Sequence, residues 1–306
     1  MRCYDAGPMK KVLLLLLFSL SAQAGVNHWT QRGPWDPHAF PGETTVLRKG
    51  ERLYAGSFNA GAFASDDGGA TWETLPGRPM AMALDGPNVW MSSWDGLWKD
   101  SRVVLPGNIW AIAANGDTVV VSNNVNELQV SHDGGGTWSV TGHNARYTNI
   151  NDLAIAGNVV YATTWPVQVS LDAGRTWSTT NADAPFSSLL LLPDRVLLGG
   201  AGVLRAPIGS ATFTVAGAGL PPNTVIEDFA WNGTTVFASV SPREGGGDSL
   251  LYASRDRGDT WVLYFRQPGV GRITEIEAEG KKVWIGTNLG VYELTEGVRK
   301  QRAVRK

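Results

Sequence analysis

Ser131-His132-Asp133-Gly134-Gly135-Gly136-Thr137-Trp138 is one of four copies of an eight-residue pattern, S-x-D-x-G-x-T-W, that decides the fold of this 306-residue chain. The other copies span residues 65–72, 170–177 and 254–261. The pattern predicts a hairpin turn, because an Asp carboxylate accepts backbone N–H groups and Gly adopts positive φ. Thr-Trp then suits the start of the next strand, with the Trp ring packing between sheets. We assign structural roles to Ser65, Asp67, Gly69, Trp72, Ser131, Asp133, Gly135, Trp138, Ser170, Asp172, Gly174, Trp177, Ser254, Asp256, Gly258 and Trp261.

A second, weaker repeat of four residues combines Val or Leu, a bulky residue, a small or apolar one, and Gly, Ser or Thr. It occurs seven times, at residues 53–56, 89–92, 119–122, 160–163, 196–199, 236–239 and 283–286. Adjacent copies are 30 to 47 positions apart, which suits units of four short strands. The chain is therefore predicted to be all-β, a single seven-bladed β-propeller of four-stranded antiparallel blades. Units two, five and seven lack the eight-residue turn.

Such a ring must be closed, since an open first or last sheet would leave an unpaired strand edge. Residues 28–33 resemble a fourth strand detached from its blade, and we expect them to complete the blade that contains residues 283–294. Residues 298–304 are the competing candidate for that edge.

The first residues resemble an export signal. Lys10-Lys11 precede an apolar run from Val12 to Leu20 and the small-x-small sequence Ala22-Gln23-Ala24. We therefore predict a signal peptide at residues 1–24, a propeller at 25–298 and a basic C-terminal tail at 299–306, in a secreted or periplasmic protein. The apolar run is shorter than the roughly 20 residues that a membrane span needs.

Composition excludes several classes of function. Residues 25–306 carry 23 Lys and Arg against 27 Asp and Glu, with five of the basic residues in the tail, so a nucleic-acid partner is not expected. The one cysteine, Cys3, lies in the leader, and the four histidines lack ligand spacing, so no metal or cofactor is expected. We expect a monomer.

The eight-residue turn is the Asp-box, so the chain resembles the Asp-box (BNR repeat) β-propellers, which include sialidases, xyloglucan-cleaving glycosidases, sortilin-type receptors and photosystem II assembly factors. The resemblance covers nearly the whole exported chain. It implies that the four turns lie on the face away from the functional site. A calcium loop is the alternative for these turns, but the spacing of an EF-hand is missing. The Arg-Ile-Pro motif of sialidases is absent, Arg48 stands in the right blade without it, and sialidase propellers have six blades.

Two sets of side chains are candidates for a functional site on the opposite face. Phe58, Trp94 and Trp165 each follow a four-residue repeat by two positions, where aromatic rings suit stacking on sugars or anchoring a protein. The alternative is that these rings cover gaps between blades.

The second set comes from the first strand of each unit, where Asp152, Asp228 and Glu275 fall in equivalent places. Thr45, Ala81, Ala111 and Leu189 occupy this position in the other units. Carboxylates converging near the axis could serve as the acid and base of a glycoside hydrolase. Otherwise they line the channel and accept hydrogen bonds from loop N–H groups.

The favoured hypothesis is an exported non-catalytic propeller that binds a glycan or protein through Phe58, Trp94 and Trp165. The alternative is a secreted glycoside hydrolase, sialidase-like or other, that uses a pair from Asp152, Asp228 and Glu275. A third class, an assembly factor for a membrane complex, would call for a basic upper patch, which the sequence does not show.

Overall fold

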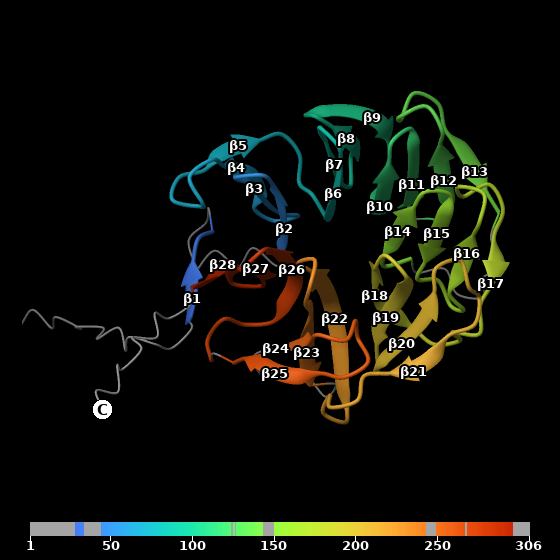
Figure 1. Ribbon diagram of the computed structural model, residues 1–306. Helices are drawn as coiled ribbons and strands as arrows, with labels where there is room; N and C mark the ends of the chain where they lie inside the picture. The colour runs from blue at the N-terminus through green and yellow to red at the C-terminus, as the bar shows by residue number, and fades with distance from the viewer. Residues whose placement is uncertain are drawn as a thin grey trace, which may run out of the picture.

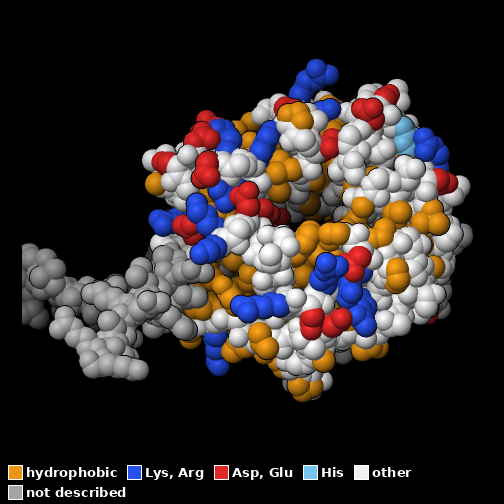
Figure 2. Space-filling view, viewed as in Figure 1, with side chains coloured by type: hydrophobic (Ala, Val, Ile, Leu, Met, Phe, Trp, Pro, Cys, Tyr) orange, Lys and Arg blue, Asp and Glu red, His pale blue; other side chains and the backbone are white. Residues whose placement is uncertain are grey.

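The computed structural model describes residues 28–33, 44–123, 125, 127–142, 150–242, 249–266 and 268–295, and their secondary structure is β throughout. Seven four-stranded antiparallel sheets follow one another around a ring, with a hollow at its centre (Figures 1 and 2). The predicted seven-bladed propeller is confirmed. We number the blades 1 to 7 in chain order and name their strands a to d from the axis outward.

The first four blades each use consecutive strands. Blade 1 contains β2 (Thr44–Lys49), β3 (Arg52–Ser57), β4 (Gly61–Ser65) and β5 (Glu73–Leu75). Blade 2 contains β6 (Ala81–Asp85), β7 (Asn88–Ser92), β8 (Gly96–Lys99) and β9 (Arg102–Pro106). Blade 3 contains β10 (Ile109–Asn115), β11 (Thr118–Asn123), β12 (Leu128–Ser131) and β13 (Ser139–Thr141). Blade 4 contains β14 (Leu153–Ala156), β15 (Val159–Ala162), β16 (Gln168–Ser170) and β17 (Ser178–Thr179).

The last blade departs from this order. Blade 5 contains β18 (Phe186–Leu191), β19 (Arg195–Gly200), β20 (Val203–Pro207) and β21 (Thr214–Ala216). Blade 6 contains β22 (Thr224–Trp231), β23 (Val236–Pro242), β24 (Leu250–Ser254) and β25 (Val262–Phe265). Blade 7 contains β26 (Ile273–Glu279), β27 (Lys282–Thr287), β28 (Gly290–Thr295) and β1 (His28–Gln31), which comes from the other end of the sequence.

The second strand of each blade is the four-residue repeat, and it is buried on both faces. Val119, Val120 and Val121 in β11 are each 0% exposed, as are Val196, Leu197 and Leu198 in β19. A strand that packs against a blade on either side reads as a continuous apolar run, without the alternation of a half-exposed strand. The described residues form seven core clusters, one at each junction between neighbouring blades.

The ring closes through β1, as the sequence predicts. β1 is antiparallel to β28, with Trp29 opposite Leu294 and Gln31 opposite Tyr292. The backbone N–H of Arg32 donates to Val291 O at 2.7 Å, and Arg32 Nε lies 3.1 Å from Glu293 Oε2. The competing segment 298–304, the predicted leader and the basic tail fall outside the described residues.

No helix in the described part of the chain is long and apolar enough to cross a membrane.

Candidate functional site

The four Asp-box turns connect strands c and d of blades 1, 3, 4 and 6 and share one set of hydrogen bonds. In blade 1, Asp67 Oδ1 accepts the Thr71 N–H at 2.8 Å and the Ser65 hydroxyl at 2.8 Å, while Oδ2 accepts the Thr71 hydroxyl at 2.6 Å. These donors, the Thr71 hydroxyl foremost, lower the pKa of Asp67 to about 2. The carboxylates are thus fully used by their own turns.

The same arrangement repeats in the other three turns. The pKa of Asp133 is lowered to about 2, chiefly by the Thr137 N–H. Partial burial raises the pKa of Asp172 and of Asp256, but hydrogen bonds from Thr and Ser outweigh it and hold both at about 2. Among the described residues, no group of three or more His, Cys, Asp or Glu could hold a metal ion, and the turns are no exception.

The central glycine of each turn packs against the preceding blade. Gly258 has φ +94°, and a Cβ placed there would lie 2.7 Å from Leu197 Cδ1 in strand b of blade 5. Gly135 has φ +92°, and its Cβ would lie 3.0 Å from the Trp90 ring in blade 2. Positive φ and close approach both require glycine here. The turns therefore seal one blade against the next.

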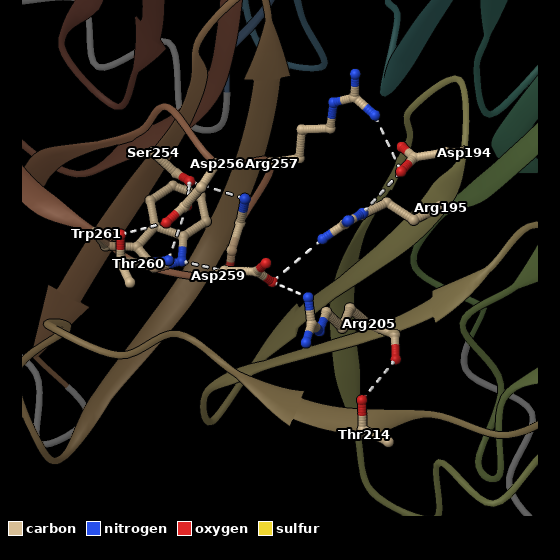
Figure 3. A network of polar contacts seen from close by, with 11 residues as sticks. Asp194, Arg195, Arg205, Thr214, Ser254, Asp256, Arg257, Asp259, Thr260 and Trp261 are labelled. Atoms are coloured by element: carbon tan, nitrogen blue, oxygen red, sulfur yellow. Dashed lines mark hydrogen bonds and ion pairs between the residues drawn. The ribbon is translucent and has the colours of Figure 1, made fainter.

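Charged residues extend this seal in blade 6 (Figure 3). Arg257 Nη1 lies 3.0 Å from Asp194 Oδ2 of blade 5, and Asp259 Oδ1 lies 3.1 Å from Arg195 Nη1. Arg205 also pairs with Asp259. The network links two blades and leaves no carboxylate of this group without a partner.

A cavity of about 800 Å³ opens at the other end of the strands, where strands a begin and strands b and c are joined. Such a volume lies within the roughly 300–1,000 Å³ of small-ligand pockets. It is lined by residues of every blade, so it lies on the axis of the ring.

Two of the three predicted aromatic residues lie together in the wall of this cavity. Phe58 is 41% exposed and Trp94 is 53% exposed, and their ring centroids are 5.2 Å apart with an interplanar angle of 36°. Trp165 follows strand b of blade 4 in the equivalent place, but it is only partly exposed and does not line the cavity. The structure thus brings Phe58 and Trp94 together and leaves Trp165 apart.

Trp110 is a third exposed aromatic side chain of the cavity, and sequence reasoning missed it. It is 45% exposed and lies at a β-bulge in β10, where the register with β11 shifts between Ile109 and Ala111. Bulges at the same point of β18, β22 and β26 direct Ser187, Glu227 and Thr274 to the cavity. An extra residue in one strand redirects a side chain, and bulges are common beside functional sites.

The three predicted carboxyl groups line the cavity, and the two aspartates accept hydrogen bonds from the next blade. Asp152 Oδ2 accepts the Leu189 N–H of blade 5 at 2.7 Å, and Asp228 Oδ2 accepts the Ile276 N–H of blade 7 at 2.7 Å. Asp228 Oδ1 also accepts the Ser188 hydroxyl at 3.2 Å. These contacts agree with the second reading of the sequence, in which the carboxyl groups line the channel and accept hydrogen bonds from N–H groups.

The axial position in blade 5 differs from the sequence prediction. Ser188 lies opposite Gly199, as Asp228 lies opposite Ser239 and Glu275 opposite Gly286. Ser188, not Leu189, is therefore the counterpart of these carboxyl residues. The sequence prediction aligned the first strands of the blades by the turn residue that ends each one. The loop at residues 192–195 contains no glycine to mark the end of β18, so the alignment of this strand was wrong by one residue.

Burial near the axis raises the pKa values of these carboxyl groups. It raises the pKa of Asp152 and of Asp228 to about 7, although backbone N–H donors favour their charged forms. Burial, with the charge of Asp228 nearby, raises the pKa of Glu275 well above its ordinary value and that of Glu277 to about 8. The cavity therefore has carboxyl groups that are partly protonated near neutral pH.

An ion pair spans the polar side of the cavity. Arg272 Nη2 lies 2.7 Å from Glu227 Oε2, and Arg272 Nε lies 3.1 Å from Glu227 Oε1. This two-point contact joins blades 6 and 7 and holds the guanidinium plane against a carboxylate. Arg48, in contrast, pairs with Glu279 at 2.7 Å and stacks on Trp284, with its side chain 6% exposed.

The repeats themselves match a known family. The BNR/Asp-box repeat model matches residues 129–140, which include the second turn. No curated protein matches the chain by sequence.

Solved structures share the fold of this chain at low identity. The extracellular domain of the hybrid two component system BT4673 from B. thetaiotaomicron has a TM-score of 0.67 and 15% identity over 88% of this chain, which spans only 39% of that one. YCF48 from Cyanidioschyzon merolae has a TM-score of 0.64 and 15% identity, covering 88% of this chain and 98% of that one. Virginiamycin B lyase from Staphylococcus aureus has a TM-score of 0.71 and 10% identity, covering 89% and 99%. The chain therefore contains a BNR/Asp-box repeat and has the fold of a seven-bladed β-propeller.

Proposed function

We propose that this chain is an exported, non-catalytic binding propeller that holds a glycan or protein ligand on the face opposite its Asp-box turns. The observation that carries the proposal is the group of exposed aromatic side chains at an axial cavity. Phe58, Trp94 and Trp110 are 41%, 53% and 45% exposed, and all three line it. Concave sites with aromatic walls and a few polar groups are the usual form of ligand pockets.

The aromatic residues support binding more directly than the carboxyl groups support catalysis. The oxygens of Asp152 accept the N–H groups of Leu153 and Leu189, both at 2.8 Å or less. A carboxyl group held in this way secures one blade to the next and has fewer free lone pairs for proton transfer. We therefore give these residues a role in joining blades and lining the ligand cavity, without a role in proton transfer.

A second candidate function is glycoside hydrolysis. It is favoured by one observation, that Asp152, Asp228 and Glu275 line the same cavity and have raised pKa values. A carboxyl group with a raised pKa near a second carboxylate is what an acid and base pair requires.

Export is supported by the leader pattern at residues 1–24 and by the extracellular description of one structural neighbour. N-terminal sequencing of the exported protein should then begin at Gly25. A chain that retains residues 1–24 outside the cytoplasm would contradict cleavage after Ala24.

The test combines a glycan array with a hydrolysis screen on the purified protein, comparing wild type with Trp94→Ala and Asp228→Asn. The binding proposal expects a glycan ligand to be retained by wild type without turnover and lost with Trp94→Ala. Turnover by wild type that Asp228→Asn abolishes would establish the hydrolase and overturn the non-catalytic proposal. Circular dichroism of each variant controls for folding.

A further inference from the structure

The charged side chains of the axial cavity all lie on one side of it, and the exposed aromatic ones on the other. Blades 1 to 3 contribute Phe58, Trp94 and Trp110 among mostly apolar residues, with Asn59 as their one polar side chain. Blades 4 to 7 contribute polar and charged residues, among them Asp152, Glu227, Asp228, Arg272 and Glu275, together with the apolar Ile150, Leu189, Phe229 and Ile276. A ligand that satisfies both sides must present an apolar face to aromatic rings and several hydrogen-bonding groups to the opposite wall.

We propose, building on the binding function above, that the cavity takes the uncharged end of a saccharide chain, with a sugar ring against Trp94 and Trp110 and its hydroxyl groups toward Asp152, Asp228 and Glu275. A pyranose ring has a C–H face that packs on aromatic rings and an edge of hydroxyl groups, which matches this division. The cavity of about 800 Å³ is large enough for more than one such ring.

The ionic groups of the cavity argue against an anionic ligand. Of the described residues that line it, Arg272 is the one cation, and both Nε and Nη2 contact Glu227. A carboxylate brought into the cavity would face three carboxyl groups and compete with Glu227 for the guanidinium. Burying a charge without an opposite partner is costly, and a repulsive wall is a common source of specificity.

The same groups suit hydroxyl partners better than a cation. Near neutral pH the carboxyl groups of Asp152 and Asp228, with pKa values of about 7, present both O–H donors and C=O acceptors. Their oxygens also accept backbone N–H groups. A lysine or arginine side chain of a protein partner would find carboxyl groups that are only partly charged, whereas sugar hydroxyls donate to and accept from either form.

The experiment is calorimetric titration at pH 7 with four neutral tetrasaccharides (of glucose, xylose, mannose and N-acetylglucosamine), with 3′-sialyllactose as the anionic probe and trilysine as the cationic one. At least one neutral tetrasaccharide should bind at least tenfold more tightly than the other two probes. Trp94→Ala and Trp110→Ala should each weaken that binding at least tenfold. Trp165→Ala, a matched control in an equivalent loop outside the cavity, should change it less than twofold.

Glu227→Gln tests the role of charge in selection. Removing the carboxylate that neutralises Arg272 should raise the affinity for 3′-sialyllactose, relative to that for the neutral saccharide, about tenfold. An unchanged ratio of the two affinities would overturn the charge argument. Rescue by Trp94→Phe of the binding lost in Trp94→Ala would separate ring stacking from a folding defect, which circular dichroism also monitors.

The outcomes distinguish this inference from the binding function itself. Preference for 3′-sialyllactose or trilysine, abolished by Trp94→Ala, would overturn the neutral-saccharide inference and leave a binding propeller. Binding that Trp165→Ala abolishes and Trp110→Ala does not would overturn the assigned cavity. Failure of every probe here and on the glycan array would overturn the neutral-saccharide inference and leave a protein as the ligand of the binding propeller.

Discussion

The aspartates of the Asp-box turns and those of the axis show how one residue type behaves in two regions of one fold. Asp67, Asp133, Asp172 and Asp256 lie at exposed or partly exposed turns, and their pKa values are about 2. Asp152 and Asp228 also accept backbone N–H groups, but their pKa values are about 7. Donors alone do not decide the charge state, because burial among other carboxyl groups outweighs them at the axis.

The comparison separates stability from recognition. At the four Asp-box turns, glycine and Trp residues join a blade to the one before it, whereas the Asp carboxylates bond within their own turns. At the axial cavity, carboxyl groups also join blades, but they remain in contact with a space that aromatic side chains line. The first region packs neighbouring blades together, and the second borders an open cavity of about 800 Å³.

The largest expected effect tests the turns. Gly258→Ala should destabilise the protein by about 3 kcal/mol, because it adds both left-handed strain and a Cβ 2.7 Å from Leu197. Gly233→Ala is the matched control, since Gly233 has φ +97° with nothing within 4 Å of its Cβ. It should cost about 1 kcal/mol. Urea unfolding monitored by Trp fluorescence measures both, and equal losses would show that close blade contact contributes nothing.

Asp228→Asn should reveal the raised pKa at the axis. The folded-state pKa of Asp228 is about 7, above the ordinary value of 3.8. The protonated Asp228 side chain therefore contributes stability that is fully present below about pH 4 and is lost as pH rises through 7. The Asn variant lacks this loss, so its stability relative to wild type should increase by about 2 kcal/mol between pH 4 and pH 6. Urea midpoints at intervals of one pH unit provide the measurement. A constant difference would contradict the shift.

Asp172→Asn should show the opposite dependence on pH. Its folded-state pKa of about 2 lies below the ordinary value, so the stability it provides is present above about pH 4 and is lost as pH falls through 2. We expect the variant to be about 1 kcal/mol less stable at pH 7, after allowance for solvent screening, and to approach wild type near pH 2. The same titration by urea unfolding tests it. A loss that persists unchanged at pH 2 would point to lost packing instead.

The smallest effect concerns the ion pairs between blades 5 and 6. Asp259→Asn removes contacts with Arg195 and Arg205, whose side chains are 22% and 38% exposed. Such pairs contribute about 0.5 kcal/mol, and salt screens them. The difference in urea midpoint between variant and wild type should therefore shrink from 0.05 M to 1 M NaCl. A difference that grows with salt would exclude an electrostatic origin.

The architecture could be predicted from sequence because its signals are local. The four turns, the seven apolar repeats and the strand at residues 28–31 each carry their own pattern, and the structure places all of them as expected. The place of Phe58 and Trp94 at the cavity could also be predicted, because each lies a fixed distance after a repeat, whereas their role in binding a ligand stays a prediction.

The remainder of the site depends on backbone irregularities that residue patterns do not reveal. Trp110 faces the cavity because β10 contains a bulge, and a regular strand would give a different alternation. The Arg272–Glu227 contact joins residues 45 positions apart on neighbouring blades. Leu189 was assigned to the axial position in place of Ser188 because the loop after β18 has no glycine to mark the end of the strand. Each case requires the register of a strand pair to be known.

The closing strand has a consequence for the order of events in folding. β1 lies near the start of the chain and its partner β28 near the end, so the pair joins residues roughly 260 positions apart, and closing such a loop costs on the order of 5 kcal/mol of chain entropy. Six blades can form from strands that are neighbours in sequence, whereas the seventh must wait until β28 has been synthesised. During that wait the edge of β1 is available to any other strand. The last contact made is therefore the one that closes the ring.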